Sequence, residues 1–314
     1  MMLKTCFGVT MKQYSLFLLM FGFFVLMLLF PRETFAGATN GLLLWFQILL
    51  PTLLPFMIVS NLLISTNAVS YISRFLRPFI QKLFCVSENG CYAILVGFIC
   101  GYPMGAKVIA DLLRTGRISK KEGAYLLSFC NNTSLMFIVS FLVMQNFQDE
   151  SLLFGTLGIL LLSPILCSFL FRIYYHVGKE KMPSSLGGGP QIHFHFAAFD
   201  HSIMNGFETI TKVGGYMILF SILFALGKNL PVRWLLPTLE ISNGIPWLIN
   251  CGLPFHVVYP LVLGVTSFGG FCATAQTYSM TYQAGLPILP YIIQKLITAM
   301  VTSLLAILYL CFIP

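Results

Sequence analysis

The sequence predicts an all-α integral membrane protein with about six transmembrane helices and two re-entrant hairpins, arranged as two inverted repeats. Composition is the first reason: of 314 residues, 57% are hydrophobic and 9% are charged, whereas soluble domains carry about 25% charged residues. The other two reasons are a series of long apolar stretches and a pair of apolar stretches that glycine interrupts. The net charge of +8 lies mainly in short loops, as in cytoplasmic loops of membrane proteins. The lipid bilayer is therefore the expected partner, and nucleic acid is not.

Apolar stretches of about 20 residues are long enough to cross a bilayer as helices. Six stretches predict such spans: 14–30, 41–65, 124–146, 152–173, 204–228 and 288–312. The first follows Lys4 and Lys12, so it also fits the apolar region of a cleaved signal peptide. A retained span is the preferred interpretation because the stretch is long for a signal peptide.

Two further apolar stretches, 89–116 and 253–285, are interrupted near their middle by Gly101 and by Gly269 with Gly270. Each half has about a dozen residues, which is too short to cross a bilayer. A pair of such halves predicts a hairpin that enters the membrane and returns to the same side, with its irregular backbone covered by protein or lining a cavity.

The order span, hairpin, span occurs twice, and the span between the two units inverts the second. Residues 96–116 also align weakly, without a gap, with residues 265–285. Opposed units of this kind are typical of secondary transporters. The distribution of Lys and Arg predicts a cell (inner) membrane protein with cytoplasmic N- and C-termini. The predicted divisions are 1–40, an N-terminal span and external loop; 41–146, the first repeat; 147–203, a linking span and cytoplasmic loop; and 204–314, the second, inverted repeat.

The first interruption carries the residues that indicate a binding site. Pro103 ends one half-helix and can begin the next, whose first N–H groups then carry a partial positive charge that favours anions. Lys107 lies one turn further on. A carboxylate-bearing ligand is therefore expected at Gly101, Tyr102, Pro103, Gly105 and Lys107. In the alternative interpretation, Lys107 pairs with Asp111 or extends its amine to the cytoplasm.

Four consecutive polar residues interrupt the predicted span 124–146, and at that depth they cannot all face lipid. They contact substrate or an ion, or they hydrogen-bond to neighbouring helices. The candidates for substrate contact are Asn131, Asn132 and Thr133, and the matching candidates in the second unit are Gly269, Gly270, Thr274 and Gln276.

Enzyme signatures do not occur in the sequence. It has no phosphate-binding loop, no HExxH and no nucleophile elbow, so an enzyme is not predicted. The nine cysteines form no CxxC pair and are interpreted as small buried apolar residues. His193 and His195 lie in a polar loop without carboxylates or cysteines that would complete a metal site. No metal and no cofactor are therefore expected.

Several segments resemble the YlbJ/SpoVV family of sporulation membrane proteins, within the wider nucleoside-recognition Gate group. They are "LLLWFQILLPTLLPFMIVSNLL", "GYPMGAKVIADLLRTGRISKKEG" and the run Asn131, Asn132, Thr133. The resemblance implies a sporulation-associated transport role, because YlbJ-like proteins are associated with moving dipicolinic acid into the developing spore.

The expected function is therefore transport of a small organic anion, similar to dipicolinate, through a site between two hairpin tips. A nucleoside transporter and a non-transporting membrane protein of spore-envelope assembly are the alternatives. The expected partner is a small-molecule substrate of anionic character, and the sequence leaves open whether the chain forms a homo-oligomer.

Overall fold

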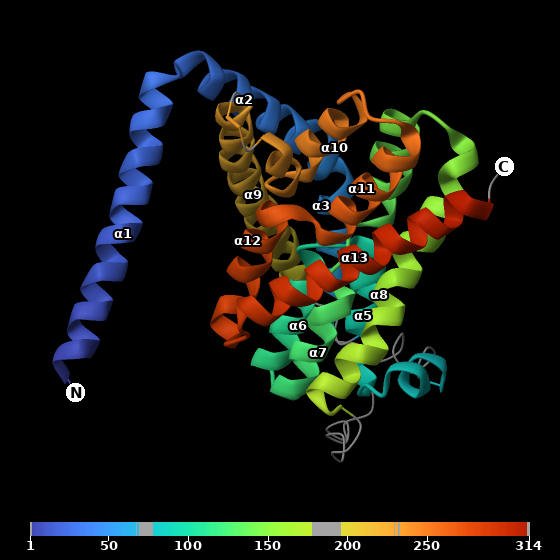
Figure 1. Cartoon of the computed structure of the whole chain (residues 1–314). Coiled ribbons are helices and arrows are strands. Elements are labelled where there is room, and N and C mark those ends of the chain that lie inside the picture. Colours follow the sequence, from blue (N-terminus) through green and yellow to red (C-terminus); the bar gives the residue numbers. More distant parts are fainter. Residues whose placement is uncertain are drawn as a thin grey trace.

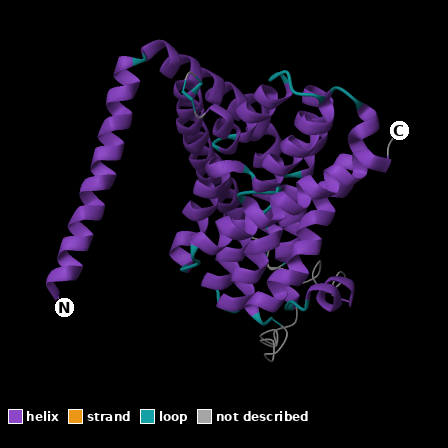
Figure 2. Cartoon of the chain, viewed as in Figure 1, coloured by secondary structure: helices purple, strands orange, loops and turns teal. Residues whose placement is uncertain are grey.

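The computed structural model describes residues 2–66, 68, 78–177, 196–228, 230–231 and 233–312. In these ranges the chain is helical, with short connecting loops and no strand (Figure 2). The predicted all-α class is confirmed. His193 and His195 lie outside the described residues, so the interpretation of their loop stays a prediction.

The helices cover most of the described chain, and Figure 1 labels the α-helices. In chain order they are α1 (Met2–Leu29), α2 (Pro31–Leu44), η1 (Trp45–Leu49), α3 (Leu50–Ser65), α5 (Glu88–Cys100), α6 (Met104–Arg114), α7 (Lys120–Cys130), η2 (Phe137–Phe147), η3 (Glu150–Leu152), α8 (Leu153–Tyr175), α9 (Phe196–Gly227), η4 (Arg233–Thr238), α10 (Ile241–Ile249), α11 (Phe255–Phe268), α12 (Gly270–Thr281), η5 (Tyr282–Ala284) and α13 (Ile288–Phe312).

Five stretches of the described chain are long and apolar enough to cross a membrane. The short helix Pro78–Phe84 and α5 form a bent pair, and the number rises to six if that pair is counted as one span. The five are Pro31–Leu63, Glu150–Tyr175, Phe196–Gly227, Phe255–Ala284 and Ile288–Phe312. Four of them overlap predicted spans. The predicted span at 14–30 falls on α1, which stands apart from the bundle (Figure 1).

The first half of the bundle contains the predicted hairpin. α5 and α6 pack against each other, and the chain reverses between them at residues 101–103. Ser87 caps α5 by accepting a hydrogen bond from the Gly90 amide (3.1 Å), as serine commonly does at helix N-termini. The buried Glu122 carboxylate accepts a hydrogen bond from the Ser87 amide (2.6 Å) and ties the hairpin base to α7. Next along the chain, α7 and η2 form one path interrupted at residues 131–134.

The second half repeats this order at the opposite end of the bundle. After α9, the short helix η4 and α10 pack against each other as a second hairpin. α11 and α12 then form a path interrupted at Gly269, and α13 closes the unit. In Figure 1, α5 and α6 lie in the lower part of the bundle and α10 lies in the upper part. The two units are thus inverted relative to each other.

The prediction of a hairpin at 253–285 is wrong. α11 packs along α13, whereas α12 packs mainly against α6 and α9. A Cβ atom placed on Gly285 would lie 3.4 Å from the Lys120 ammonium nitrogen, so this stretch ends beside the start of α7, at the base of the first hairpin. It therefore runs through the bundle, and its alignment with 96–116 paired a crossing segment with a hairpin. The physical reason is that Gly269, with φ of 82°, ends a helix without dictating the direction that the chain takes next.

Each hairpin has its own apolar core. The cluster around α5, α6 and α7 includes Tyr92, Ile109 and Phe129, and the cluster around α10, α11 and η2 includes Ile245 and Val262. Because neither cluster spans the whole bundle, the hydrophobic effect stabilises each hairpin against its own neighbours. The region between the clusters is where the helix breaks meet.

This arrangement predicts which residues share a membrane face. Single cysteines in place of the exposed Thr115 and Gln283 should react from one face with an impermeant thiol reagent in a cysteine-free background, and a cysteine in place of the exposed Asn250 should react from the other. Complete labelling after detergent treatment controls for cysteine reactivity. Labelling of Gln283→Cys and Thr115→Cys from opposite faces would contradict the crossing of α11 and α12.

Candidate functional site

Three interruptions of the helices meet in the middle of the bundle. The Tyr102 amide, at the tip of the first hairpin, donates a hydrogen bond to the carbonyl oxygen of Asn132 (2.7 Å). The Thr133 hydroxyl donates to the carbonyl oxygen of Thr266 at the end of α11 (2.7 Å). The α7–η2 and α11–α12 paths thus cross at their breaks, with the first hairpin tip packed against the crossing.

The second hairpin tip reaches the same region from the opposite end. The Cys272 amide, in the first turn of α12, donates to the carbonyl oxygen of Leu239 (2.8 Å). Each tip is therefore bonded to one broken path: Tyr102 to α7–η2 and Leu239 to α11–α12. This is a structural correspondence between the halves that the sequence alignment missed.

Two of the glycines at the breaks leave no room for a side chain. Gly101 has φ of 72° and Gly270 has φ of 81°, which non-glycine residues rarely adopt. A Cβ atom on Gly101 would lie 2.8 Å from the carbonyl oxygen of Asn132, and one on Gly270 would lie 3.1 Å from that of Thr238. Both hairpin tips therefore depend on close approach between backbones.

Asn131 joins four helices at this point. Its side-chain oxygen accepts a hydrogen bond from the Ala106 amide of α6 (3.2 Å). Its side-chain nitrogen donates to Thr277 of α12 (2.7 Å) and to Tyr291 of α13 (2.9 Å). Asn131 itself is the C-cap of α7 and is fully buried. Residues 131–134 were expected either to contact a substrate or an ion or to hydrogen-bond to neighbouring helices. Asn131 hydrogen-bonds to neighbouring helices.

Lys295 of α13 holds the backbone at the same break. Its ammonium group donates to the carbonyl oxygen of Asn131 (3.2 Å) and to the side-chain oxygen of Asn132 (3.2 Å). Its exposed fraction is 1%. Among the described residues it forms no ion pair with a carboxylate. A buried ammonium without an opposite charge is costly, and the hydrogen bonds to these two oxygens offset part of that cost.

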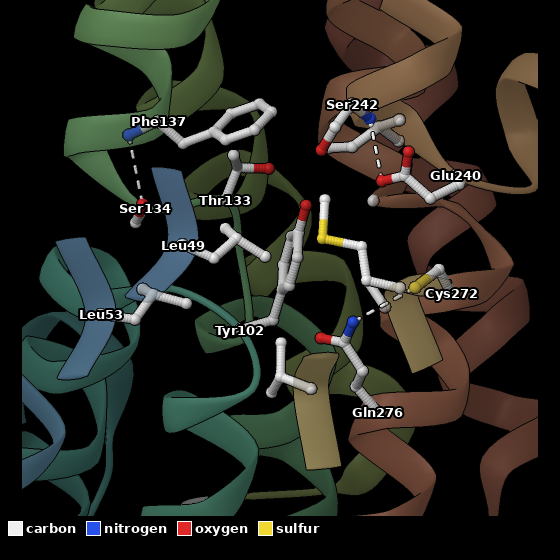
Figure 3. A pocket seen from close by; sticks show the side chains of 15 residues that line it. Leu49, Leu53, Tyr102, Thr133, Ser134, Phe137, Glu240, Ser242, Cys272 and Gln276 are labelled. Atoms are coloured by element: carbon white, nitrogen blue, oxygen red, sulfur yellow. Dashed lines mark hydrogen bonds between the residues drawn. The ribbon is translucent and has the colours of Figure 1, made fainter. Parts of the chain in front are cut away.

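A cavity lies between the crossing and the second hairpin tip (Figure 3). Its volume is about 30 Å³, enough for one or two water molecules and too small for an organic solute. Tyr102 points into it, between residues of the first half and residues of the second. The polar residues of its wall are Tyr102, Thr133, Ser134, Glu240, Ser242, Cys272 and Gln276. The structure thus has a small cavity with a mixed polar and apolar wall where the breaks meet.

Glu240 is the charged residue of this wall. It is 3% exposed and caps α10: one carboxylate oxygen accepts from the Ser242 amide (2.9 Å), and the other accepts from the Asn243 amide (2.8 Å) and side chain (2.8 Å). These bonds compensate for its burial. They also aim the positive end of α10 at the carboxylate, and so fix a negative charge beside the cavity.

Lys107 lies outside the cavity wall. Its ammonium group donates to the Thr209 hydroxyl of α9 (2.9 Å). Asp111 pairs with Arg114 (3.7 Å) rather than with Lys107. At the start of α6, the Gly105 amide bonds to the Gly101 carbonyl (3.1 Å) and the Ala106 amide bonds to Asn131. These two N–H groups are therefore already satisfied by the protein in this closed arrangement.

The other predicted residues divide between the cavity and the packing around it. Gln276 and Gly269 line the cavity. Gly105 packs closely on α7, where a Cβ atom would lie 3.0 Å from the Cys130 carbonyl oxygen. Thr274 donates back to the Gly270 carbonyl within its own helix (3.0 Å). The structure thus brings together Tyr102, Thr133, Gly269 and Gln276 at one cavity, with Asn131 and Asn132 behind it.

The segment that contains the first hairpin and the α7–η2 path matches a family model. Residues 46–148 match the family model described as "Gate: Nucleoside recognition". The chain is also 26% identical over 311 residues to the sporulation integral membrane protein YlbJ of Bacillus subtilis (strain 168), covering 85% of this chain and 75% of that protein. No solved structure matches the chain significantly. The predicted resemblance is confirmed, and the protein is a multi-pass integral membrane protein.

The Gate segment contains the first hairpin tip, Lys107 and Asn131 but ends before Glu240 and Lys295. Sequence reasoning missed both of these residues. Lys295 carries a signal that was available, since a lone ionisable residue inside an apolar span is by itself a reason to suspect function. Glu240 lies between the predicted span 204–228 and the predicted hairpin 253–285, in a stretch predicted to be a loop. An acidic residue is common in a loop, so only the tertiary structure reveals that Glu240 is buried.

The contacts of Asn131 predict a large effect of its removal. Asn131→Ala removes hydrogen bonds to three buried partners, of which Thr277 and Tyr291 still bond each other (3.5 Å). Since an unpaired buried group costs about 1–3 kcal/mol and this bond compensates in part, we expect destabilisation by about 2–5 kcal/mol. The measurement is thermal unfolding of the purified protein in detergent. Asn146→Ala, which removes one side-chain bond to the Phe141 carbonyl (2.7 Å), is the matched control. Equal melting temperatures of the two variants would contradict the central role of Asn131.

Proposed function

We propose that the protein is a transporter that moves a small polar solute through the cavity between the two hairpin tips. The observation that carries this proposal is the meeting of two hairpin tips and two interrupted helices at one polar cavity. Irregular backbone at membrane depth is tolerated where it is covered by protein or lines an aqueous path, and discontinuous helices in inverted units are the usual substrate sites of secondary transporters. Movement of the tips relative to the crossing would open the cavity to one side.

The proposed substrate is a small organic anion of the dipicolinate type. Two ammonium groups support it, those of Lys107 on the hairpin and Lys295 behind the crossing, which donate hydrogen bonds to hydroxyl, carbonyl or amide oxygens. The relative in Bacillus subtilis is named a sporulation integral membrane protein, which supports a sporulation-associated membrane role. In this proposal the protein lies in the cell membrane with both termini in the cytoplasm.

A nucleoside is the second candidate substrate. Glu240 on the cavity wall would repel a carboxylate, whereas it could accept hydrogen bonds from ribose hydroxyls. Tyr102 offers an aromatic face and Gln276 offers an amide, a combination suited to a nucleobase. The family description "nucleoside recognition" points in the same direction.

Uptake into vesicles that contain only this protein tests both substrates. Dipicolinate and uridine are offered to proteoliposomes, with protein-free vesicles as the background. Uptake of dipicolinate supports the proposal, uptake of uridine alone supports the second candidate, and uptake of neither favours the non-transporting role in spore-envelope assembly.

The hairpin tip should matter for this transport. Gly101→Ala places a methyl group against the backbone of Asn132, so we expect insertion to persist and uptake to fall at least tenfold, which corresponds to about 1.4 kcal/mol. Gly116→Ala is the matched control, because Gly116 has a similar φ of 67° but nothing within 4 Å of the added Cβ. The tip would be excluded from the pathway if both variants transported like the wild type.

Charge at Lys107 separates the two substrate classes. A charge-assisted hydrogen bond contributes about 1.5–3 kcal/mol, so Lys107→Gln should weaken half-maximal uptake of dipicolinate by roughly 10–150-fold and uridine uptake much less. Thr209→Val keeps the ammonium group and removes its present partner, so it should retain dipicolinate affinity. Unchanged dipicolinate affinity in Lys107→Gln would remove Lys107 from the site.

A further inference from the structure

Lys295 occupies a place that in a transporter suits a metal cation. Its side-chain nitrogen donates hydrogen bonds to two oxygens. One is the backbone carbonyl of Asn131, at the C-terminal end of the half-helix α7, and the other is the side-chain amide oxygen of Asn132. The C-terminal end of a helix carries a partial negative charge. Unwound carbonyls and half-helix C-termini are the groups that coordinate Na⁺ or respond to H⁺ in secondary transporters. Here the ammonium group of Lys295, which is covalently attached to α13, occupies the position that a metal cation would take at the end of α7.

The elements around Lys295 supply no compensating charge. α8 packs against α13 and contributes the buried Cys167 thiol, and α13 itself contributes the Tyr291 hydroxyl, which accepts a hydrogen bond from Asn131. α7 ends at Cys130, α12 presents Thr277, and α11 approaches this face of α13 through Gly264. No carboxylate of the described chain lies within ion-pair distance of Lys295. The Lys295 ammonium group is therefore stabilised mainly by its hydrogen bonds to the oxygens of Asn131 and Asn132.

Gain or loss of a proton by Lys295 therefore changes the strength of the hydrogen bonds between Lys295 and the break at Asn131 and Asn132. The ammonium form binds both oxygens through charge-assisted hydrogen bonds, which are about twice as strong as neutral ones. When one N–H bond breaks, the proton passes to a water molecule that reaches Lys295 as the break loosens, the electron pair stays on nitrogen, and the neutral amine holds the same oxygens weakly. Asn131 and Asn132 precede Thr133 and Ser134 directly, and the latter two line the cavity, so loosening of the break reaches the cavity wall.

We propose that Lys295 is a tethered cation that closes the helix crossing when protonated and releases it when neutral, so that each transport cycle moves a proton. This inference rests on the proposed transport function for its role in coupling. The closing and opening of the cavity is a property of the protein alone and is measured without substrate.

The first experiment follows access to the cavity through Cys272, which lines it and is 3% exposed. The protein retains Cys272 and the exposed Cys311, with its other cysteines replaced by alanine. The rate of modification of Cys272 by a small thiol reagent, relative to that of Cys311, is measured from pH 6 to pH 9 in proteoliposomes. Comparison of variants at each pH removes the effect of thiol ionisation on the reagent.

The rate of Cys272 modification should then differ between the protein with Lys295 and the variants Lys295→Met and Lys295→Arg. Lys295→Met lacks the tether, so its Cys272 should react at least tenfold faster than in the protein with Lys295 at low pH, and the ratio should fall toward one as pH rises. Lys295→Arg keeps its charge at every pH used, so its Cys272 should stay slow at high pH. If Lys295→Met does not fold, the divergence between lysine and arginine at high pH still decides. Identical pH profiles for all versions that fold would overturn the proposal.

A second experiment connects this switch to transport. Dipicolinate or uridine uptake, whichever the wild type shows, is measured with and without an imposed pH gradient, and internal pH is followed with an entrapped dye. Wild-type uptake should respond to the gradient and move protons, whereas uptake by Lys295→Arg should not respond. Gradient-independent uptake by the wild type would overturn the coupling role. Absence of any uptake, with pH-dependent access to Cys272 intact, would reject the transport function and leave the switch standing.

Discussion

The structure depends on the hydrogen bonds of one buried asparagine. Asn131 ends α7 and bonds through its side chain to α6, α12 and α13, while its carbonyl oxygen receives the ammonium group of Lys295. At the depth of a membrane such backbone and amide groups have no water to bind, so each must find a partner in the protein. The interruption of α7 is tolerated because this network satisfies its backbone groups, and the network in turn fixes the positions of the first hairpin and of α12 and α13 relative to α7.

The same arrangement gives the molecule its functional character. Two inverted units each pack a hairpin tip onto a broken helix, and the tips meet at a cavity too small for an organic solute. A small cavity between two such units suits alternating access, in which one unit moves against the other. Glu240 and Lys295 place opposite charges on the two sides of the crossing, each held by backbone or amide groups rather than by the other charge.

Part of the site was predictable from local sequence. The run of polar residues at 131–134 and the Gly-Tyr-Pro break after α5 contradict an uninterrupted membrane helix, so both were identified as unusual without knowledge of the fold. Lys107 was identified as a candidate as well, but its partner Thr209 lies on α9, far away in the sequence. Glu240 escaped notice because its segment is short and mixed in polarity, and only packing against α12 shows that it is buried.

The sequence by itself determined the membrane class, the helical content and the positions of the breaks, because hydropathy, proline and glycine act over a few residues. It did not determine the path of the chain beyond each break. Gly101 and Gly269 both end a helix, yet the chain reverses after the first and continues through the bundle after the second. A positive φ permits a change of direction, and the direction taken is decided by which helices bury the apolar faces on either side. For 253–285 those faces lie against α13 on one side of Gly269 and against α6 and α9 on the other, which only the tertiary structure reveals.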